Sequence, residues 1–287
     1  MPEFKNIKKK VVTLTIVSLM AANVFVWASV ALAGEKNLVI KVYDVGQGDS
    51  IFIKTPDNYK ILVDGGPTNK VVDYLNKDLG LNDRTLDLVV LTHPQADHMF
   101  GLIETLKRFG VKKVITSDVT NPTSMYKLWI DTLIASHLQP EYIYAGESIT
   151  LSDNVSLQIL SPKQQKPIVT DLNQAAVVIK LSYGNFDMLL TADADQQVQP
   201  YTSNTSHVEV LKVPHHGSKT ALREDFAKEL NPDVSVISVG IKNFYGHPNP
   251  NTLELLKNTS KKVLRTDQNG TVTFVSNGQT WYTRVER

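Results

Sequence analysis

Apolar residues recur along the chain in two spacings, one typical of strands and one typical of amphipathic helices. Short alternating or continuous apolar runs, bounded by Gly, Pro, Asn or Asp, predict strands. Residues 69–79 show helical spacing instead, and Gly80 follows them as a natural C-cap. In the first half of the chain we predict strands at 37–45, 51–54, 60–63, 87–91 and 111–116, and helices at 69–79, 99–109 and 122–137.

The second half of the chain is richer in strands. The predicted strands are 142–144, 155–160, 175–181, 186–191, 208–213, 233–239, 262–266, 271–275 and 279–285, and the predicted helices are 221–230 and 250–256. Asn269-Gly270 is a hairpin signal, so we expect 262–266 to pair with 271–275, and 279–285 to add an edge strand. Hairpins and strand–helix units mix without a linker. This pattern predicts an α/β fold, one compact domain with two sheets face to face and helices outside.

Polar residues able to bind a metal ion follow the apolar strands repeatedly. Five of the seven histidines lie in these tails. The residues concerned are Asp64, His93, Asp97, His98, Asp193, His215, His216 and His247. Strand ends on one edge of an α/β sandwich can converge, so the pattern predicts one shared site.

The stretch 92–98 is the centre of this pattern. It places two imidazoles and a carboxylate directly after the apolar run 87–91, and we expect it to form an irregular loop. Imidazoles and carboxylates can hold a hydrolytic cation and leave a position open for water. A carboxylate such as Asp193 could bridge two ions.

Each of these residues also has an ordinary structural explanation. Asp193 could cap a helix starting near residue 195, and the pair His215-His216 could be a loop without metal. His247, which precedes a proline, could be a turn residue. Asp64 is expected to orient the His93–His98 segment through hydrogen bonds rather than to bind metal.

Composition narrows the chemistry. The chain has no cysteine, which excludes disulfides, thiolate nucleophiles and cysteine-bound zinc. A metal must therefore be held by His, Asp, Asn or Gln, a set that suits Zn or Mn.

The N-terminus predicts export. Four lysines (Lys5, Lys8, Lys9 and Lys10) precede residues 11–33, which carry no charge. We expect residues 1–33 to be either a signal peptide cleaved after Ala33 or an uncleaved membrane anchor through 11–33, with residues 34–287 outside the cytoplasm.

Charge limits the class of partner. The formal net charge is +1, but residues 1–33 hold +3 of it, so residues 34–287 carry −2. This is not the basic surface of a strong nucleic-acid binder, and any contact with nucleic acid must be local.

Six stretches resemble the metallo-β-lactamase superfamily, and more closely the metallohydrolase domain of ComEC-type competence (DNA-uptake) proteins and their stand-alone relatives. They are DVGQGDS (44–50), ILVDGG (61–66), LTHPQADH (91–98), LLTAD (189–193), KVPHHGS (212–218) and YGHP (245–248). The resemblance runs from about residue 37 to 283. It implies an αββα sandwich, two mixed sheets with helices on the outer faces and a site at one edge.

The resemblance also implies roles for individual residues. His93 and Gln95 would bind a first divalent ion, Asp97 and His98 a second, and Asp193 would bridge them. His247 would be a further metal ligand, and Asp97, His215 and His216 would take part in catalysis. For the pair His215-His216, phosphate contact, protonation of the leaving group and metal binding all stay open. Supporting roles are expected for Asp64, Asn173 and Ser218.

One position departs from the family pattern, and it leaves three functions open. Gln95 stands where the superfamily has His and the competence proteins usually have Asp, so the first site should be weaker. The leading prediction is an exported metal-dependent phosphodiesterase or nuclease that cleaves DNA with metal-activated water. The alternatives are a hydrolase of esters, lactones or β-lactams, and a non-catalytic DNA-binding relative with a degenerate metal site.

Overall fold

The computed structural model describes residues 15–20, 22–23, 37–80, 83–152, 154–164, 171–199 and 206–287. The chain divides into two units, 1–36 and 37–287. Residues 15–20 and 22–23 are helical, and the rest of the predicted leader, including its cleavage site, lies outside the described residues. Where the structure describes the chain, no helix is both long and apolar enough to cross a membrane. The signal peptide or anchor stays a prediction.

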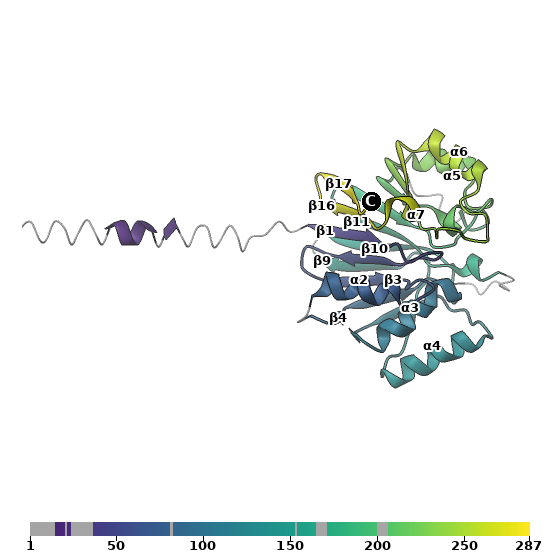
Figure 1. Ribbon diagram of the computed structural model, residues 1–287, viewed down its shortest axis with the longest axis horizontal. Coiled ribbons are helices and arrows are strands. Elements are labelled where there is room, and N and C mark those ends of the chain that lie inside the picture. The colour runs from purple at the N-terminus through teal and green to yellow at the C-terminus, as the bar shows by residue number, and fades with distance from the viewer. Residues whose placement is uncertain are drawn as a thin grey trace, which may run out of the picture. The chain divides into compact units, whose positions relative to one another are not determined.

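Two large mixed sheets form the centre of residues 37–287 (Figure 1). The first has the order β17 (Trp281–Val285), β16 (Val272–Ser276), β1 (Leu38–Val42), β2 (Ile51–Lys54), β3 (Lys60–Val63), β5 (Leu88–Leu91), β7 (Val114–Thr116), β8 (Glu141–Tyr142). The second has the order β15 (Lys262–Arg265), β14 (Val234–Ile237), β13 (Val210–Lys212), β12 (Phe186–Leu190), β11 (Val178–Tyr183), β10 (Val155–Ser161), β9 (Ser148–Ser152). Two short strands, β4 (Thr85–Leu86) and β6 (Gly110–Val111), pair separately.

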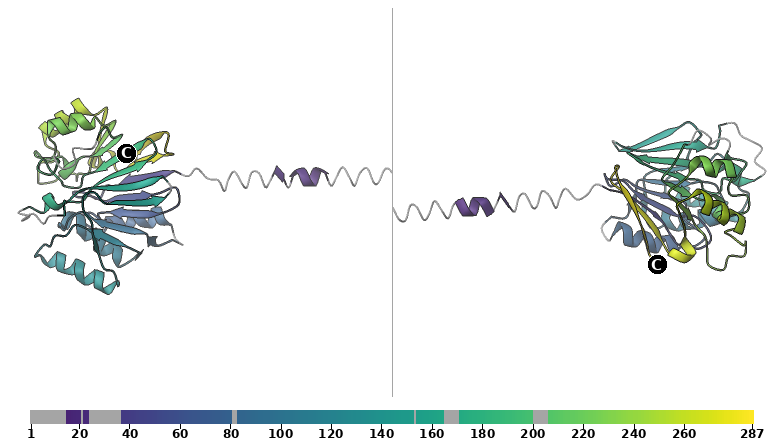
Figure 2. Two further views of the ribbon diagram at one scale, coloured as in Figure 1. Left: turned by 180° about the vertical axis from the view of Figure 1, so that it is seen from behind. Right: turned by 90° about the horizontal axis from the view of Figure 1, so that it is seen from above.

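Helices cover the outer faces of both sheets. On the first sheet lie α2 (Lys70–Leu79), α3 (Ala96–Leu106) and α4 (Ser124–Ala135), and on the second lie α5 (Glu224–Leu230) and α6 (Pro250–Thr259). Figure 2 shows the same layers from behind and from above. Short helical turns are η1 (Leu172–Ala175), η3 (Pro214–Gly217) and α7 (Thr266–Asn269).

The alternation of side chains along a strand explains the three apolar layers. In β12, Phe186, Met188 and Leu190 lie in the core between the sheets, while Leu189 packs under the outer helices. Both faces are buried at these positions, and Asp187, near the start of the strand, is its one polar residue. The predicted αββα architecture is confirmed.

Parallel strands bring the polar tails together. The strand β3 runs parallel to β5, and β12, β13 and β14 run parallel to one another. Their carboxyl ends therefore lie at one edge of each sheet, and the polar residues that follow them are candidates for a common site.

Two predictions about local structure are wrong. Residues 262–266 and 271–275 do not form a hairpin, because β15 pairs with β14 in the second sheet and β16 pairs with β1 and β17 in the first. Residues 266–269 form the helical turn α7 between them. The segment 92–98 is also not irregular throughout, since α3 begins at Ala96 and carries Asp97 and His98 in its first turn.

Candidate metal centre

A hydrogen-bonded pair orients the imidazole of His98. Its Nδ1 lies 2.8 Å from Asp64 Oδ2, which also accepts from Thr92 Oγ1 at 2.7 Å. The other oxygen of Asp64 accepts from the Thr92 backbone N–H at 2.9 Å. With Nδ1 engaged, His98 presents Nε2 to the site. Asp64, which the sequence predicts to orient this segment, lies on the Nδ1 side of the His98 ring.

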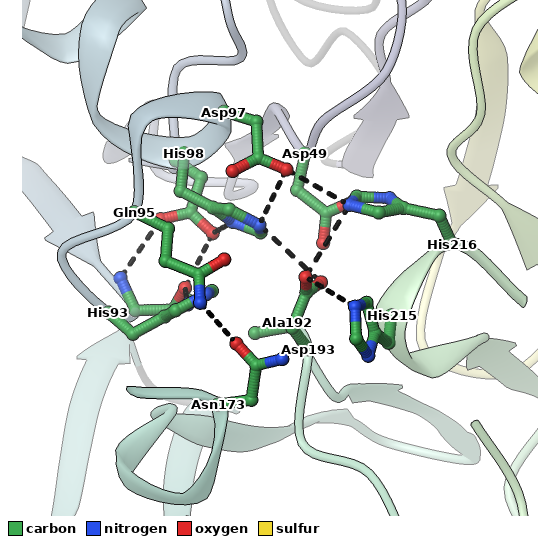
Figure 3. A network of polar contacts seen from close by, with 12 residues as sticks. Asp49, His93, Gln95, Asp97, His98, Asn173, Ala192, Asp193, His215 and His216 are labelled. Atoms are coloured by element: carbon green, nitrogen blue, oxygen red, sulfur yellow. Dashed lines mark hydrogen bonds and ion pairs between the residues drawn. The ribbon is translucent and has the colours of Figure 1, made fainter. Parts of the chain in front are cut away.

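His98 meets three other residues at one point: Asp97 of the same helix, Asp193 and His216 (Figure 3). Donor atoms of Asp97, His98, Asp193 and His216 all lie within 4.8 Å of one another. Asp193 Oδ1 is 3.4 Å from His98 Nε2, and Asp193 Oδ2 is 3.5 Å from His216 Nε2. Asp97 Oδ2 is 3.4 Å from His216 Nε2. We call these four residues the donor cluster.

The donor cluster suits a cation. The Nε2 atoms of His98 and His216 and the Oδ1 atom of Asp193 are buried and have no hydrogen-bond partner among the described residues. Buried polar atoms are normally paired, so three unpaired atoms aimed at one point need a partner that hydrogen bonds do not supply. Two imidazoles and two carboxylates match the ligands of Zn or Mn.

Charge within the cluster also favours a cation. Burial alone would raise the pKa of Asp193, but the His216 and His98 imidazoles hold it well below its usual range. In the same way the pKa of Asp97 lies at about 2, because His98 and His216 outweigh burial. Burial would lower the pKa of both imidazoles, but the Asp193 carboxylate raises it. Without a cation, the site therefore attracts protons.

His93 and Gln95 lie beside the donor cluster. His93 is fully buried, its Nε2 has no partner among the described residues, and burial lowers its pKa to about 3, so its ring is neutral. The Gln95 side-chain Nε2 donates to Asn173 Oδ1 at 2.7 Å. Gln95 was expected to be a metal ligand and Asn173 a supporting residue. Their side chains are hydrogen-bonded to each other.

The other predicted residues lie farther out. His215 Nε2 is 3.9 Å from Asp193 Oδ2 and its side chain is partly exposed. The ring of His247 lies 5.7 Å from that of His215, outside the donor cluster. Ser218 donates its N–H to the His215 carbonyl and accepts from Thr252, so it holds the turn. The sequence left metal and catalytic roles open for His215 and His216. Of the two, His216 is the one that lies inside the donor cluster.

The turn that carries His215 and His216 is strained. Both residues have positive φ angles, 48° and 53°, which side chains other than glycine adopt at a cost. The His216 Nδ1 donates to the Ser238 carbonyl at 2.9 Å, which fixes the ring with Nε2 toward Asp193. The strained backbone conformation places both imidazoles at the site.

Sequence analysis missed a buried ion pair beneath the site. Lys212 is completely buried and donates its ammonium to Asp49 Oδ2. The other Asp49 oxygen lies 3.6 Å from His216 Nδ1. Two signals were visible: a lysine inside an apolar run, and an aspartate after a glycine-rich turn. Neither indicates that residues 163 positions apart are partners.

The comparison with protein families identifies the class. The model of the Metallo-beta-lactamase superfamily matches residues 43–241. This match covers more than half of the chain and every residue of the donor cluster. The chain belongs to the metallo-β-lactamase superfamily.

Competence proteins are among its relatives, as the resemblance predicted. ComE operon protein 3 of Bacillus subtilis (strain 168) is 28% identical over 296 residues, covering 95% of this chain and 37% of the relative. Competence protein ComA of Neisseria gonorrhoeae is 27% identical over 271 residues, covering 86% of this chain and 35% of the relative. The chain thus spans little more than a third of each relative's length.

Solved structures share the fold. YhfI from Bacillus subtilis superposes with a TM-score of 0.51 at 14% identity, covering 81% of this chain and 98% of its own. Zn(2+)-bound PqqB from Methylobacterium extorquens superposes with a TM-score of 0.51 at 10% identity, covering 78% of this chain and 97% of its own. At these identities the likeness concerns the fold. Together, the family, the relatives and the donor cluster support a metallo-β-lactamase superfamily hydrolase that uses a divalent cation.

Proposed function

We propose that this chain is a metal-dependent phosphodiesterase that cleaves DNA outside the cytoplasm. The observation that carries the proposal is the donor cluster, with its unpaired atoms on His98, His216 and Asp193. A bound divalent cation supplies an activated water and stabilises the charge that develops on the phosphate.

We infer a single cation in the cluster of Asp97, His98, Asp193 and His216. A second ion beside His93 would have to take the Gln95 side-chain oxygen as a ligand, since the amide nitrogen donates to Asn173 and cannot bind a cation. An amide is also a weaker ligand than the carboxylate or imidazole that the family uses there. The neutral ring of His93 then either lines the site without binding a cation or serves as a weak ligand.

The residues around the cluster have separate tasks in this proposal. Asp64 and the Ser238 carbonyl fix the rings of His98 and His216, so little reorganisation is needed when a cation binds. His215 is partly exposed and lies 3.9 Å from Asp193. It is the group placed to give a proton to the leaving oxygen.

The choice of DNA rests on the relatives. One of them is named Competence protein ComA and another ComE operon protein 3, and this chain matches about a third of each. The apolar segment 11–33 and the lysines before it support a site outside the cytoplasm, with the segment as a cleaved signal or a membrane anchor.

The test uses the full-length chain purified in a mild detergent. Its metal content is measured, and cleavage of single-stranded DNA is assayed with Mn²⁺ or Zn²⁺. We expect about one ion per chain, and Asp97→Ala should reduce cleavage at least ~100-fold because it removes a ligand. The matched control is Asp131→Ala, an exposed aspartate paired with Lys127 on α4. Unchanged cleavage by Asp97→Ala would show that the site is wrong.

The hydrogen bond between Gln95 and Asn173 favours a second candidate, a non-catalytic DNA-binding relative with a degenerate site. This candidate predicts that the wild-type chain holds no metal and cuts nothing, and that Gln95→Asp restores both. Cleavage of a lactone or β-lactam without cleavage of any phosphodiester would instead indicate an ester, lactone or β-lactam hydrolase.

A further inference from the structure

A loop beside the site presents large apolar side chains to solvent. Phe244 is fully exposed, at 102% of its reference area, and Tyr245 is 72% exposed. Ile241, in the same loop, is 61% exposed. Water-facing aromatic side chains grouped in one loop indicate a binding surface more often than isolated ones do. We call residues 241–245 the aromatic loop.

The aromatic loop is held in place at its base. The Asn243 side chain donates to the carbonyls of Gly240 and His247 and accepts the His247 N–H at 3.0 Å. Just after the loop, the Asn249 N–H donates to the Gly217 carbonyl at 2.8 Å, which ties it to the turn carrying His215 and His216. A braced loop presents its rings with little loss of conformational entropy on binding.

A series of rings leads from the aromatic loop to the donor cluster. The ring of Tyr245 stacks on that of His247, with centroids 5.8 Å apart and planes 28° apart. His247 contacts His215 edge-on at 5.7 Å, and His215 Nε2 reaches to 3.9 Å from Asp193. The exposed rings therefore continue directly into the site.

We propose that the aromatic loop is a stacking platform for the bases of single-stranded nucleic acid, which holds a strand while its backbone enters the donor cluster. This rests on the proposed function and names single strands as the substrate. Unstacked bases offer flat rings of the kind that stack on aromatic side chains, whereas bases within a duplex are already stacked. Exposed Lys242, in the same loop, suits the phosphate backbone.

Other occupants suit the loop less well. Lys242, which is exposed, and Asn243, which braces the loop, separate Ile241 from the adjacent rings of Phe244 and Tyr245. A stable protein interface buries about 1,200 Å² or more, mostly continuous area. The formal charge of −2 on residues 34–287 also means that a nucleic acid must be held by local contacts rather than by a basic surface.

The experiment measures binding of fluorescent oligonucleotides to the full-length chain in detergent, with EDTA present so that no cleavage occurs. The strands are oligo-dT and an abasic strand of equal length. Phe244→Ala and Phe244→Leu should each weaken oligo-dT binding about tenfold, Phe244→Trp should preserve it, and the abasic strand should not distinguish them.

Tyr282→Ala is the matched control. Tyr282 is exposed, at 45%, but pairs with Val275 opposite Val39, at the end of the first sheet away from the site. The Tyr282→Ala variant should bind oligo-dT and the abasic strand as the wild type does.

Three results would overturn the platform. The first is equal affinity of the wild type and Phe244→Ala for oligo-dT, including no binding by either. The second is full binding of oligo-dT by Phe244→Leu, which would indicate a general apolar contact. The third is an equal loss of affinity of Phe244→Ala for oligo-dT and for the abasic strand. None of these bears on the cation or on cleavage, which the metal content and the Asp97→Ala assay test separately.

Discussion

Ala192, next to Asp193, is held in a strained backbone conformation. Its φ is 47°, a region that glycine enters freely and alanine does not. The positive φ therefore has a physical cost at this position, and the side chain is buried as well.

Ala192→Gly should stabilise the chain by about 0.5–1 kcal/mol, the relief of left-handed strain less the added entropy of the unfolded chain. Chemical denaturation measures the change. The control is Ala194→Gly, whose φ is not positive and whose methyl is equally buried, and which should destabilise the chain. Destabilisation by both substitutions would contradict the argument from φ.

Asp64 contacts the donor cluster through His98 alone. It accepts three hydrogen bonds, two from Thr92 and one from His98 Nδ1, and touches no other member of the donor cluster. A carboxylate behind a histidine fixes its ring and increases its basicity.

Asp64→Asn should therefore weaken cation binding about 10–100-fold, measured by competition with a chelating dye. Asp87→Asn is the matched control, since Asp87 is also buried and accepts the Lys60 N–H at 2.8 Å, but lies away from the cluster. If both variants keep wild-type cation affinity, the orientation of His98 does not depend on Asp64.

At the scale of elements, α3 determines where two members of the cluster lie. This helix approaches the loop after β3 so closely that a Cβ on Gly101 would lie 1.9 Å from the Gly65 carbonyl oxygen. The Gly101 N–H donates to the Gly66 carbonyl, and the Gly65 N–H donates to the His98 carbonyl. The glycines therefore fix the height of Asp97 and His98 over the sheet.

Gly101→Ala should destabilise the fold by at least about 2 kcal/mol, because helix and loop must separate. In the fraction that folds, cation affinity should fall as well, since α3 carries Asp97 and His98. Denaturation and cation titration measure the two effects. At Gly110 the nearest atom to an added Cβ is 3.6 Å away, so Gly110→Ala should leave cation affinity unchanged.

At the scale of the whole molecule, the donor cluster couples folding, protons and the cation. The pKa of His98 and of His216 is raised in the fold by nearby carboxylates, despite burial. Their protonation therefore stabilises the cation-free fold fully below about pH 6.5, the unfolded value, and this contribution is lost as pH rises through the folded values. A cation displaces these protons and replaces their stabilising charge.

The rise in melting temperature on adding Mn²⁺ or Zn²⁺ should therefore be larger at pH 8.5 than at pH 6. It is measured against the same samples in EDTA. Asp97→Ala, which removes a ligand, should show a smaller rise at both pH values. A rise independent of pH would mean that cation and protons do not compete for the same atoms.

Periodicity along the chain was enough to predict most elements and the αββα class, because alternation and helical spacing are local properties. The buried residues of α2 are those that its spacing indicates, and Gly80 ends it at φ 75°. The polar tails after the strands also identified the edge where the site lies. The resemblance in six stretches pointed to the superfamily that the family model matches.

Only the tertiary structure decided what depends on distant partners. A glycine after asparagine predicts a turn but not that β15 and β16 join different sheets. His216, and not His247, lies in the donor cluster, and the Ser238 carbonyl fixes its ring there. The partner of buried Lys212 comes from the loop before β2, a strand of the other sheet. The sequence by itself determined which elements form and which residues can bind a cation, since both follow from local chemistry. Packing of the sheets determined which of those residues meet.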